Sequence, residues 1–145
     1  MVIERCFRSF LTVTKNVLLK VVREELGVES ADRRLMSAIL NHRLHLGKGD
    51  VLECESIYGK RFSVYVSAEK TEEVESALAA TKRFMVENQV VAVTDVEELI
   101  FGNRHYNTFS SSGHLLSRLV RLGFAENVDK SSFRIPEGLN QCLVL

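Results

Sequence analysis

The chain has 145 residues, of which 46% are hydrophobic and 26% are charged, and its 19 basic residues balance 19 acidic ones. This length suits one compact domain or two small modules, and the composition is that of a globular protein. A net charge of zero excludes a uniformly basic nucleic-acid-binding protein.

The N-terminal third of the chain predicts two helices. Apolar residues recur three and four positions apart over residues 7–26, which predicts one continuous helix that Gly27 ends. A second helix is expected over residues 30–46. Because the first helix is strongly apolar, it has to be buried. We therefore expect residues 1–68 to form either a dimerisation element or a degenerate copy of the module that follows.

The middle of the chain predicts a β-hairpin and a third helix. Residues 51–55 and 61–66 show strand-type patterns and are joined by a short connection that contains Gly59, as in an antiparallel hairpin. A helix is then expected over residues 71–88. Its first turn is rich in glutamate, which suits the positive end of the helix dipole better than a metal or acid–base site.

The C-terminal part predicts a series of short elements. Residues 90–93 predict a strand, and Thr94 with Glu97 predicts a capping box at the start of a helix that ends near Phe101. A further helix is expected over residues 114–122. Two short strands are expected to follow it, at residues 124–128 and 132–135.

Residues 71–135 thus have the order helix, strand, helix, helix, strand, strand. A serine-rich turn, Ser110–Ser112, precedes the third of these helices. The segment Leu119-Val-Arg-Leu-Gly-Phe124 ends that helix and leads into the next strand. This order and this segment resemble a winged-helix domain, although residues 104–107 enlarge the turn between the second and third helices. We therefore expect an α+β protein with N-terminal helices and a β-hairpin (1–68), followed by a winged-helix-like domain (69–145).

The resemblance implies that the third helix of this domain is a recognition helix lying in the DNA major groove. Four leucines of the helix, at 115, 116, 119 and 122, would form its buried face, and the opposite polar stripe would be exposed. Serines at the helix start suit phosphate oxygens, and cations on the wing suit the DNA backbone. The implied contacts are Ser110, Ser111, Ser112, His114, Ser117, Arg118, Arg121, Lys130 and Arg134.

The charges are unevenly distributed along the chain. Residues 1–46 carry eight basic and five acidic groups, residues 47–99 carry six and eleven, and residues 100–145 carry five and three. The basic excess therefore falls on the N-terminal helices and on the implied recognition helix and wing. Zero net charge still allows a small basic footprint.

The remaining motifs indicate neither catalysis nor secretion. No nucleotide-binding, serine-hydrolase or zinc-protease motif occurs, and His42 and His45 lack further ligands nearby, so we expect no enzyme activity, cofactor or metal. Cys6, Cys54 and Cys142 are odd in number and widely spaced, as expected for buried thiols in the reducing cytoplasm or nucleus. No apolar run approaches the roughly 18 residues of a membrane span.

The sequence therefore predicts a DNA-binding protein of transcription regulation or replication, acting as a homodimer or as a subunit of a complex. Two alternatives stay open. The polar face of the recognition helix also suits the docking of another protein, as in an interaction subunit, and the same basic face also suits RNA.

Overall fold

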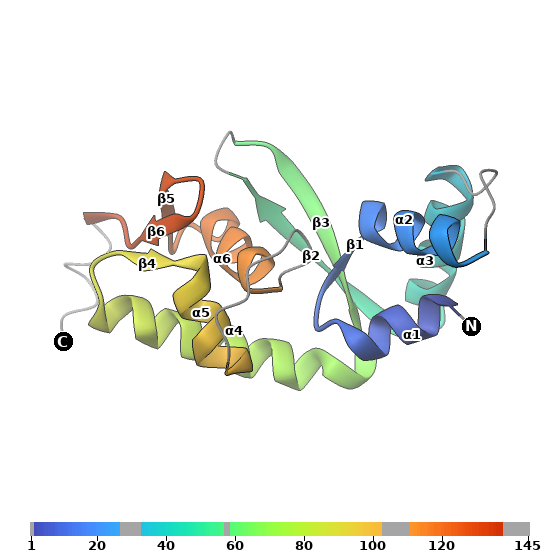
Figure 1. Cartoon of the computed structure of the whole chain (residues 1–145), viewed down its shortest axis with the longest axis horizontal. Helices are drawn as coiled ribbons and strands as arrows, with labels where there is room; N and C mark the ends of the chain where they lie inside the picture. The colour runs from blue at the N-terminus through green and yellow to red at the C-terminus, as the bar shows by residue number, and fades with distance from the viewer. Residues whose placement is uncertain (1, 27–32, 57–58, 103–110, 138–145) are drawn as a thin grey trace. The chain divides into compact units, whose positions relative to one another are not determined.

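The computed structural model describes residues 2–26, 33–56, 59–102 and 111–137 (Figure 1). The chain forms two compact units. The first comprises Met1–Leu52 and Ser63–Val74, and the second comprises Glu53–Phe62 and Glu75–Leu145. The second unit therefore includes the outer part of a β-hairpin whose base belongs to the first unit. We call Glu53–Phe62 the outer hairpin.

Within its described residues, the first unit contains three α-helices and a three-stranded sheet. Its strands have the order β1-β3-β2, and Val13 of β1 lies opposite Tyr65 of β3 in an antiparallel pair. A 3-10 turn at Ala68–Lys70 follows β3. In chain order the elements are α1 (Val2–Ser9), β1 (Val13–Thr14), α2 (Lys15–Leu26), α3 (Arg33–His45), β2 (Gly49–Glu55) and β3 (Arg61–Ser67).

The prediction of one continuous helix over residues 7–26 is wrong. The structure has α1, then strand β1, then α2, because Val13 leaves the helical path to pair with β3 and is only 1% exposed. Pairing with a strand some fifty residues later thus overrides the local helical spacing. The predicted hairpin is confirmed, since β2 and β3 are neighbouring strands.

The core of the first unit lies between its helices and β1. It also contains a buried charge, since Arg43 of α3 is 8% exposed. Its guanidinium forms an ion pair with Glu4 of α1 and lies 4.3 Å from the ring centroid of Phe7. The apolar members of this core are Ile3, Cys6, Phe7, Val13, Leu18, Leu19, Val22, Met36 and Leu40.

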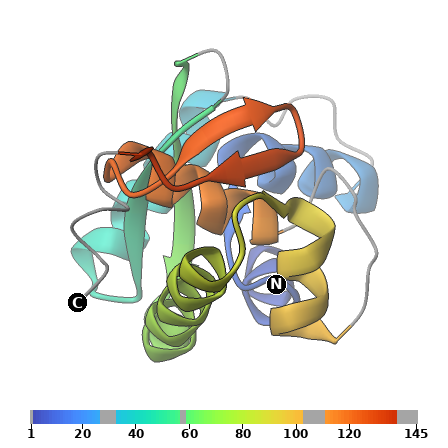
Figure 2. The same ribbon diagram turned by 90° about the vertical axis from the view of Figure 1, so that its left-hand side faces the viewer.

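The described part of the second unit also contains three α-helices and a three-stranded sheet (Figure 2). The strand order is β4-β6-β5, and Phe133 of β6 lies opposite Val91 of β4 and Asn127 of β5. In chain order the elements are α4 (Thr71–Glu87), β4 (Val91–Ala92), α5 (Val93–Phe101), α6 (Ser111–Arg121), β5 (Glu126–Asp129) and β6 (Ser132–Arg134).

The side chains at the centre of this unit come from all of its helices and from its sheet. Helices α5 and α6 pack against each other, and the side chain of Phe133, on strand β6, packs in the same core. The core residues are Met85, Val91, Val93, Val96, Leu116, Leu119, Ala125, Phe133 and Ile135. The whole chain is thus of the predicted α+β class.

The predicted capping box of Thr94 and Glu97 is wrong. The N-cap residue is Ala92 and α5 begins at Val93, two residues earlier than a cap at Thr94 would place it, and the amide of Ala92 donates to the Asp95 carboxylate at 3.1 Å. Tertiary contacts set this earlier start, because the Val93 amide donates to the Ser131 carbonyl and the Val93 side chain is buried. The predicted end of the helix is confirmed, since Gly102 has a left-handed φ of 75°.

The two units share one topology. Each has the order helix, strand, helix, helix, strand, strand, and in each sheet the third strand lies between the first and the second. Helix α4 opens this order in the second unit, as α1 does in the first. Within the part of the chain that the structure describes, no helix is long and apolar enough to cross a membrane.

Candidate nucleic-acid interface

Helix α6 is held in place by its leucines. Leu115, Leu116 and Leu119 are fully buried, as predicted from their spacing. Leu122 was expected on the same face, but its side chain is 52% exposed, because the helix ends at Arg121 and Gly123 then turns the chain with a φ of 81°. The buried face is therefore shorter than the sequence pattern indicates.

The serines at the start of α6 point inward. Ser112 is 0% exposed and its hydroxyl donates to the carboxylate of Glu97, which joins α6 to α5. Ser111 is buried as well. The expectation that these hydroxyls are exposed to a phosphate group is therefore wrong for both residues, because packing of the two helices encloses them. Ser110 lies outside the described residues.

The outer hairpin contacts the polar stripe of α6 at His114 and Arg118. The imidazole of His114 meets the ring of Phe62 edge-on, with centroids 6.2 Å apart. The Cys54 thiol donates to the His114 carbonyl at 3.6 Å, and Arg118 Nη1 donates to the Glu53 carbonyl at 3.0 Å. Residues from the hairpin thus occupy part of the face that the sequence assigns to a DNA duplex.

This cover changes the electrostatics of the stripe. Burial lowers the pKa of His114 to about 4, so its imidazole is neutral at neutral pH. Burial also raises the pKa of the Cys54 thiol to about 12. The stripe is less exposed than predicted, since His114, Ser117 and Arg118 are all only partly exposed. Each of the covering residues Glu53, Cys54 and Phe62 precedes the α6 residue that it contacts by more than fifty positions, so local spacing could not reveal them.

Three of the predicted contacts are exposed. Arg121 is the last residue of α6, and Lys130 lies in the turn between β5 and β6. That turn is ordered by the Asp129 carboxylate, which accepts from the Ser131 amide at 2.9 Å. Arg134 is exposed on β6, where it forms an ion pair with Glu126 at 2.6 Å. The second unit therefore presents cations at the end of α6 and on its β-hairpin.

Helix α3 occupies the same topological position in the first unit and is absent from the predicted contacts. Its 13 residues include three arginines and two histidines and no acidic residue. Met36, Leu40 and Arg43 face the core, and the opposite face exposes Arg34, Asn41 and His45. Their helical spacing of seven and four residues places them on one side. The lack of any acidic residue over 33–45 is the sequence signal that marks this face.

No family model matches the chain, and no curated protein or solved structure shows significant similarity to it. The candidate interface therefore rests on the geometry of the two units. Among the residues that the structure describes, no group of three or more His, Cys, Asp and Glu side chains is arranged to hold a metal ion.

Proposed function

We propose that this chain binds duplex DNA through two winged-helix units. The observation that carries the proposal is the shared topology of the units, combined with a third helix in each, α3 and α6, that contains arginines and no acidic residue. The element order that resembles a winged-helix domain in residues 71–135 also occurs in the first unit. DNA binding in transcription regulation or replication is the setting that this proposal favours.

The exposed side chains of the two units suit different contacts to DNA. In the first unit, Arg34, Asn41 and His45 on α3 are free of the core and present donors suited to base edges or phosphates. In the second unit, Arg121 and Lys130 are exposed and suited to phosphates. We assign base reading to α3, because the outer hairpin covers the corresponding face of α6.

The experiment is a titration of a fluorescently labelled random-sequence duplex with the full chain at two salt concentrations. The variants are Arg34→Gln with His45→Gln in the first unit, and Arg121→Gln with Lys130→Gln in the second. The matched control is Arg83→Gln, an exposed arginine on α4, whose first turn is acidic.

We expect affinity to fall steeply with salt, with a slope of about −0.9 per neutralised phosphate. Loss of Arg121 and Lys130 should make that slope shallower by about 1.8, for two contacts. Arg83→Gln should leave it unchanged. The proposal fails if the duplex does not bind at low salt, or if the control weakens binding as much as the paired variants do. Preferential binding of an RNA of the same sequence would replace DNA with RNA as the ligand.

A protein-docking role is the second candidate, and the cover on α6 favours it. The polar face of α6 already contacts a backbone carbonyl and an aromatic ring of the outer hairpin, which are protein groups. Light scattering at micromolar concentration tests the simplest case, a homodimer. A monomer that also fails to bind DNA or RNA would leave a subunit of a different complex as the remaining proposal.

A further inference from the structure

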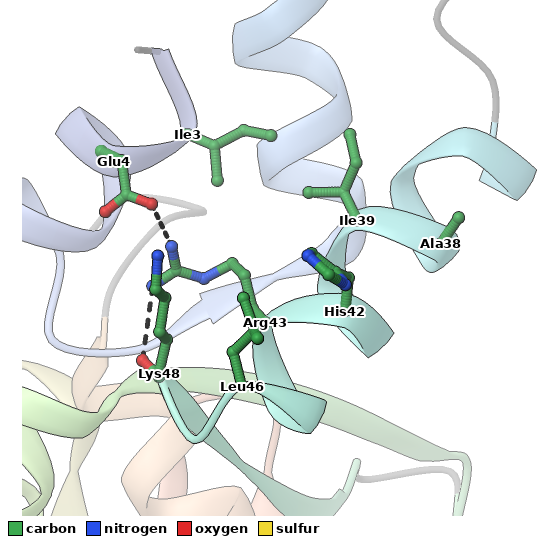
Figure 3. Close-up of a pocket in the computed structure, with 8 residues that line it drawn as sticks. All are labelled: Ile3, Glu4, Ala38, Ile39, His42, Arg43, Leu46 and Lys48. Carbon is green, nitrogen blue, oxygen red and sulfur yellow. Dashed lines mark hydrogen bonds and ion pairs between the residues drawn. The ribbon is translucent and has the colours of Figure 1, made fainter.

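A pocket of about 430 Å³ opens between α1 and α3 in the first unit (Figure 3). Its volume lies in the range of small-molecule sites. Two residues of α1, four of α3 and two of the following turn line it. They are Ile3, Glu4, Ala38, Ile39, His42, Arg43, Leu46 and Lys48.

The lining is divided by chemistry. Glu4, Arg43 and Lys48 lie together on one side of the pocket in Figure 3, whereas Ala38, Ile39 and the imidazole of His42 lie on the other. Ile3 is buried in the core beneath the pocket. The Leu46 side chain is half-exposed, so a ligand that covers it would remove apolar surface from water, which is favourable. A ligand that fits both sides has an apolar body and a polar end.

The charged side of the pocket is fixed in position. Arg43 is nearly fully buried, forms an ion pair with Glu4 and donates to the Lys48 carbonyl at 3.4 Å. Because these contacts hold the guanidinium before a ligand arrives, little ordering remains to be done on binding. Its charge is balanced by Glu4.

The ammonium group of Lys48 supplies the remaining charge. Lys48 is exposed, and none of the residues that the structure describes forms an ion pair with it. Because the charges of Arg43 and Glu4 cancel, the formal charges of Glu4, Arg43 and Lys48 add up to one positive unit. A single carboxylate matches this charge, whereas an ammonium group would be repelled.

We propose that this pocket binds a small amphipathic carboxylate. Its carboxylate pairs with the Lys48 ammonium beside the Arg43 guanidinium, and its hydrocarbon body covers Ile3, Ile39 and Leu46. The proposal does not depend on DNA binding. The pocket lies within the first unit, and its lining residues do not include Arg34, Asn41 or His45 of the exposed face of α3.

The test uses octanoate, 1-octanol and octylammonium as probes of equal chain length, added to the full chain at neutral pH. Binding is followed by amide chemical shifts in NMR spectra and by calorimetry. We expect saturable binding of octanoate that shifts the amides of Ile3, Ile39 and Leu46. Octylammonium should bind at least about tenfold more weakly, because its charge has the wrong sign.

The decisive variant is Lys48→Met, which keeps an unbranched side chain and removes the charge. It should weaken octanoate about fivefold, the upper range for one exposed ion pair, and leave 1-octanol unchanged. The matched control is Lys60→Met, at an exposed lysine outside the pocket, which should change neither. Circular dichroism confirms that both variants fold. The proposal is overturned if octanoate does not saturate, if octylammonium binds as well, or if Lys48→Met has no effect on octanoate.

Discussion

His114 of α6 and Phe62 of β3 form an edge-to-face aromatic pair, with ring planes inclined at 62° and centroids 6.2 Å apart. Phe62 precedes His114 by about fifty positions in the chain. The packing around His114 limits the access of water to the imidazole, and this burial lowers its pKa to about 4. A helix face that is polar in sequence is therefore in part an internal contact surface. Four predictions test this surface and the cores of the two units.

The first prediction concerns pH. The unfolded chain binds a proton at His114 below its ordinary pKa of 6.5, whereas the folded unit excludes that proton down to about pH 4. The contribution of His114 is therefore fully present above pH 6.5 and is lost as the pH falls toward 4. We expect the free energy of unfolding to drop by at most about 2 kcal/mol between pH 7 and pH 5 from this group.

Urea unfolding at the two pH values measures this drop. His114→Phe keeps an aromatic ring at the contact and should abolish this part of the pH dependence. His45→Gln, at an exposed histidine of α3, should retain it. An unchanged pH dependence in His114→Phe would show that another group is responsible.

The second prediction concerns the Cys54 thiol. Cys54 is 0% exposed, and burial raises its pKa to about 12, so both access and thiolate formation are suppressed. We expect iodoacetamide at pH 8 to leave Cys54 unmodified in the folded chain and to modify it in denaturant, as read by mass spectrometry of peptides. Lys60→Cys, on the exposed part of the same hairpin, is the matched control and should react quickly. Equal rates at positions 54 and 60 would mean that the outer hairpin does not stay on α6.

The third prediction separates structure from ligand binding at Ser112. Its buried hydroxyl donates to Glu97, so Ser112→Ala leaves that carboxylate without this donor. We expect a loss of about 1–3 kcal/mol in unfolding free energy, with DNA affinity unchanged at temperatures where the variant is folded. Ser117→Ala, at a partly exposed position of the same helix, should stay within about 0.5 kcal/mol of the parent chain. A loss of DNA affinity without a loss of stability would restore the phosphate role of Ser112.

The fourth prediction concerns Arg43. Its planar guanidinium pairs with Glu4, donates to the Lys48 carbonyl and stacks on Phe7. A lysine ammonium cannot make these contacts together, so Arg43→Lys should lower stability by about 2 kcal/mol. Arg34→Lys, at an exposed position of α3, should leave the thermal unfolding midpoint nearly unchanged. If both variants unfold at the same temperature, Arg43 contributes no more than a surface arginine.

Local patterns were sufficient where a segment depends on its own neighbours. The 3.6-residue spacing located α3 and α4, alternation located β2 and β3, and Gly102 ended α5 as expected. The same spacing failed at Val13, where β1 interrupts the predicted helix to pair with β3. Helical spacing over residues 7–26 is compatible with α1 and α2 separately, so it could not show the break.

The sequence by itself determined the element types of the second unit, the burial of Leu115, Leu116 and Leu119 on α6, and the absence of acidic residues from α3 and α6. Only the tertiary structure decided which polar groups meet solvent. Ser112 points into the contact with α5, and the outer hairpin covers His114. The physical reason is that secondary structure follows side chains a few positions apart, whereas burial depends on every element that packs against a face. That packing removes much of α6 from a predicted DNA surface and leaves α3 exposed.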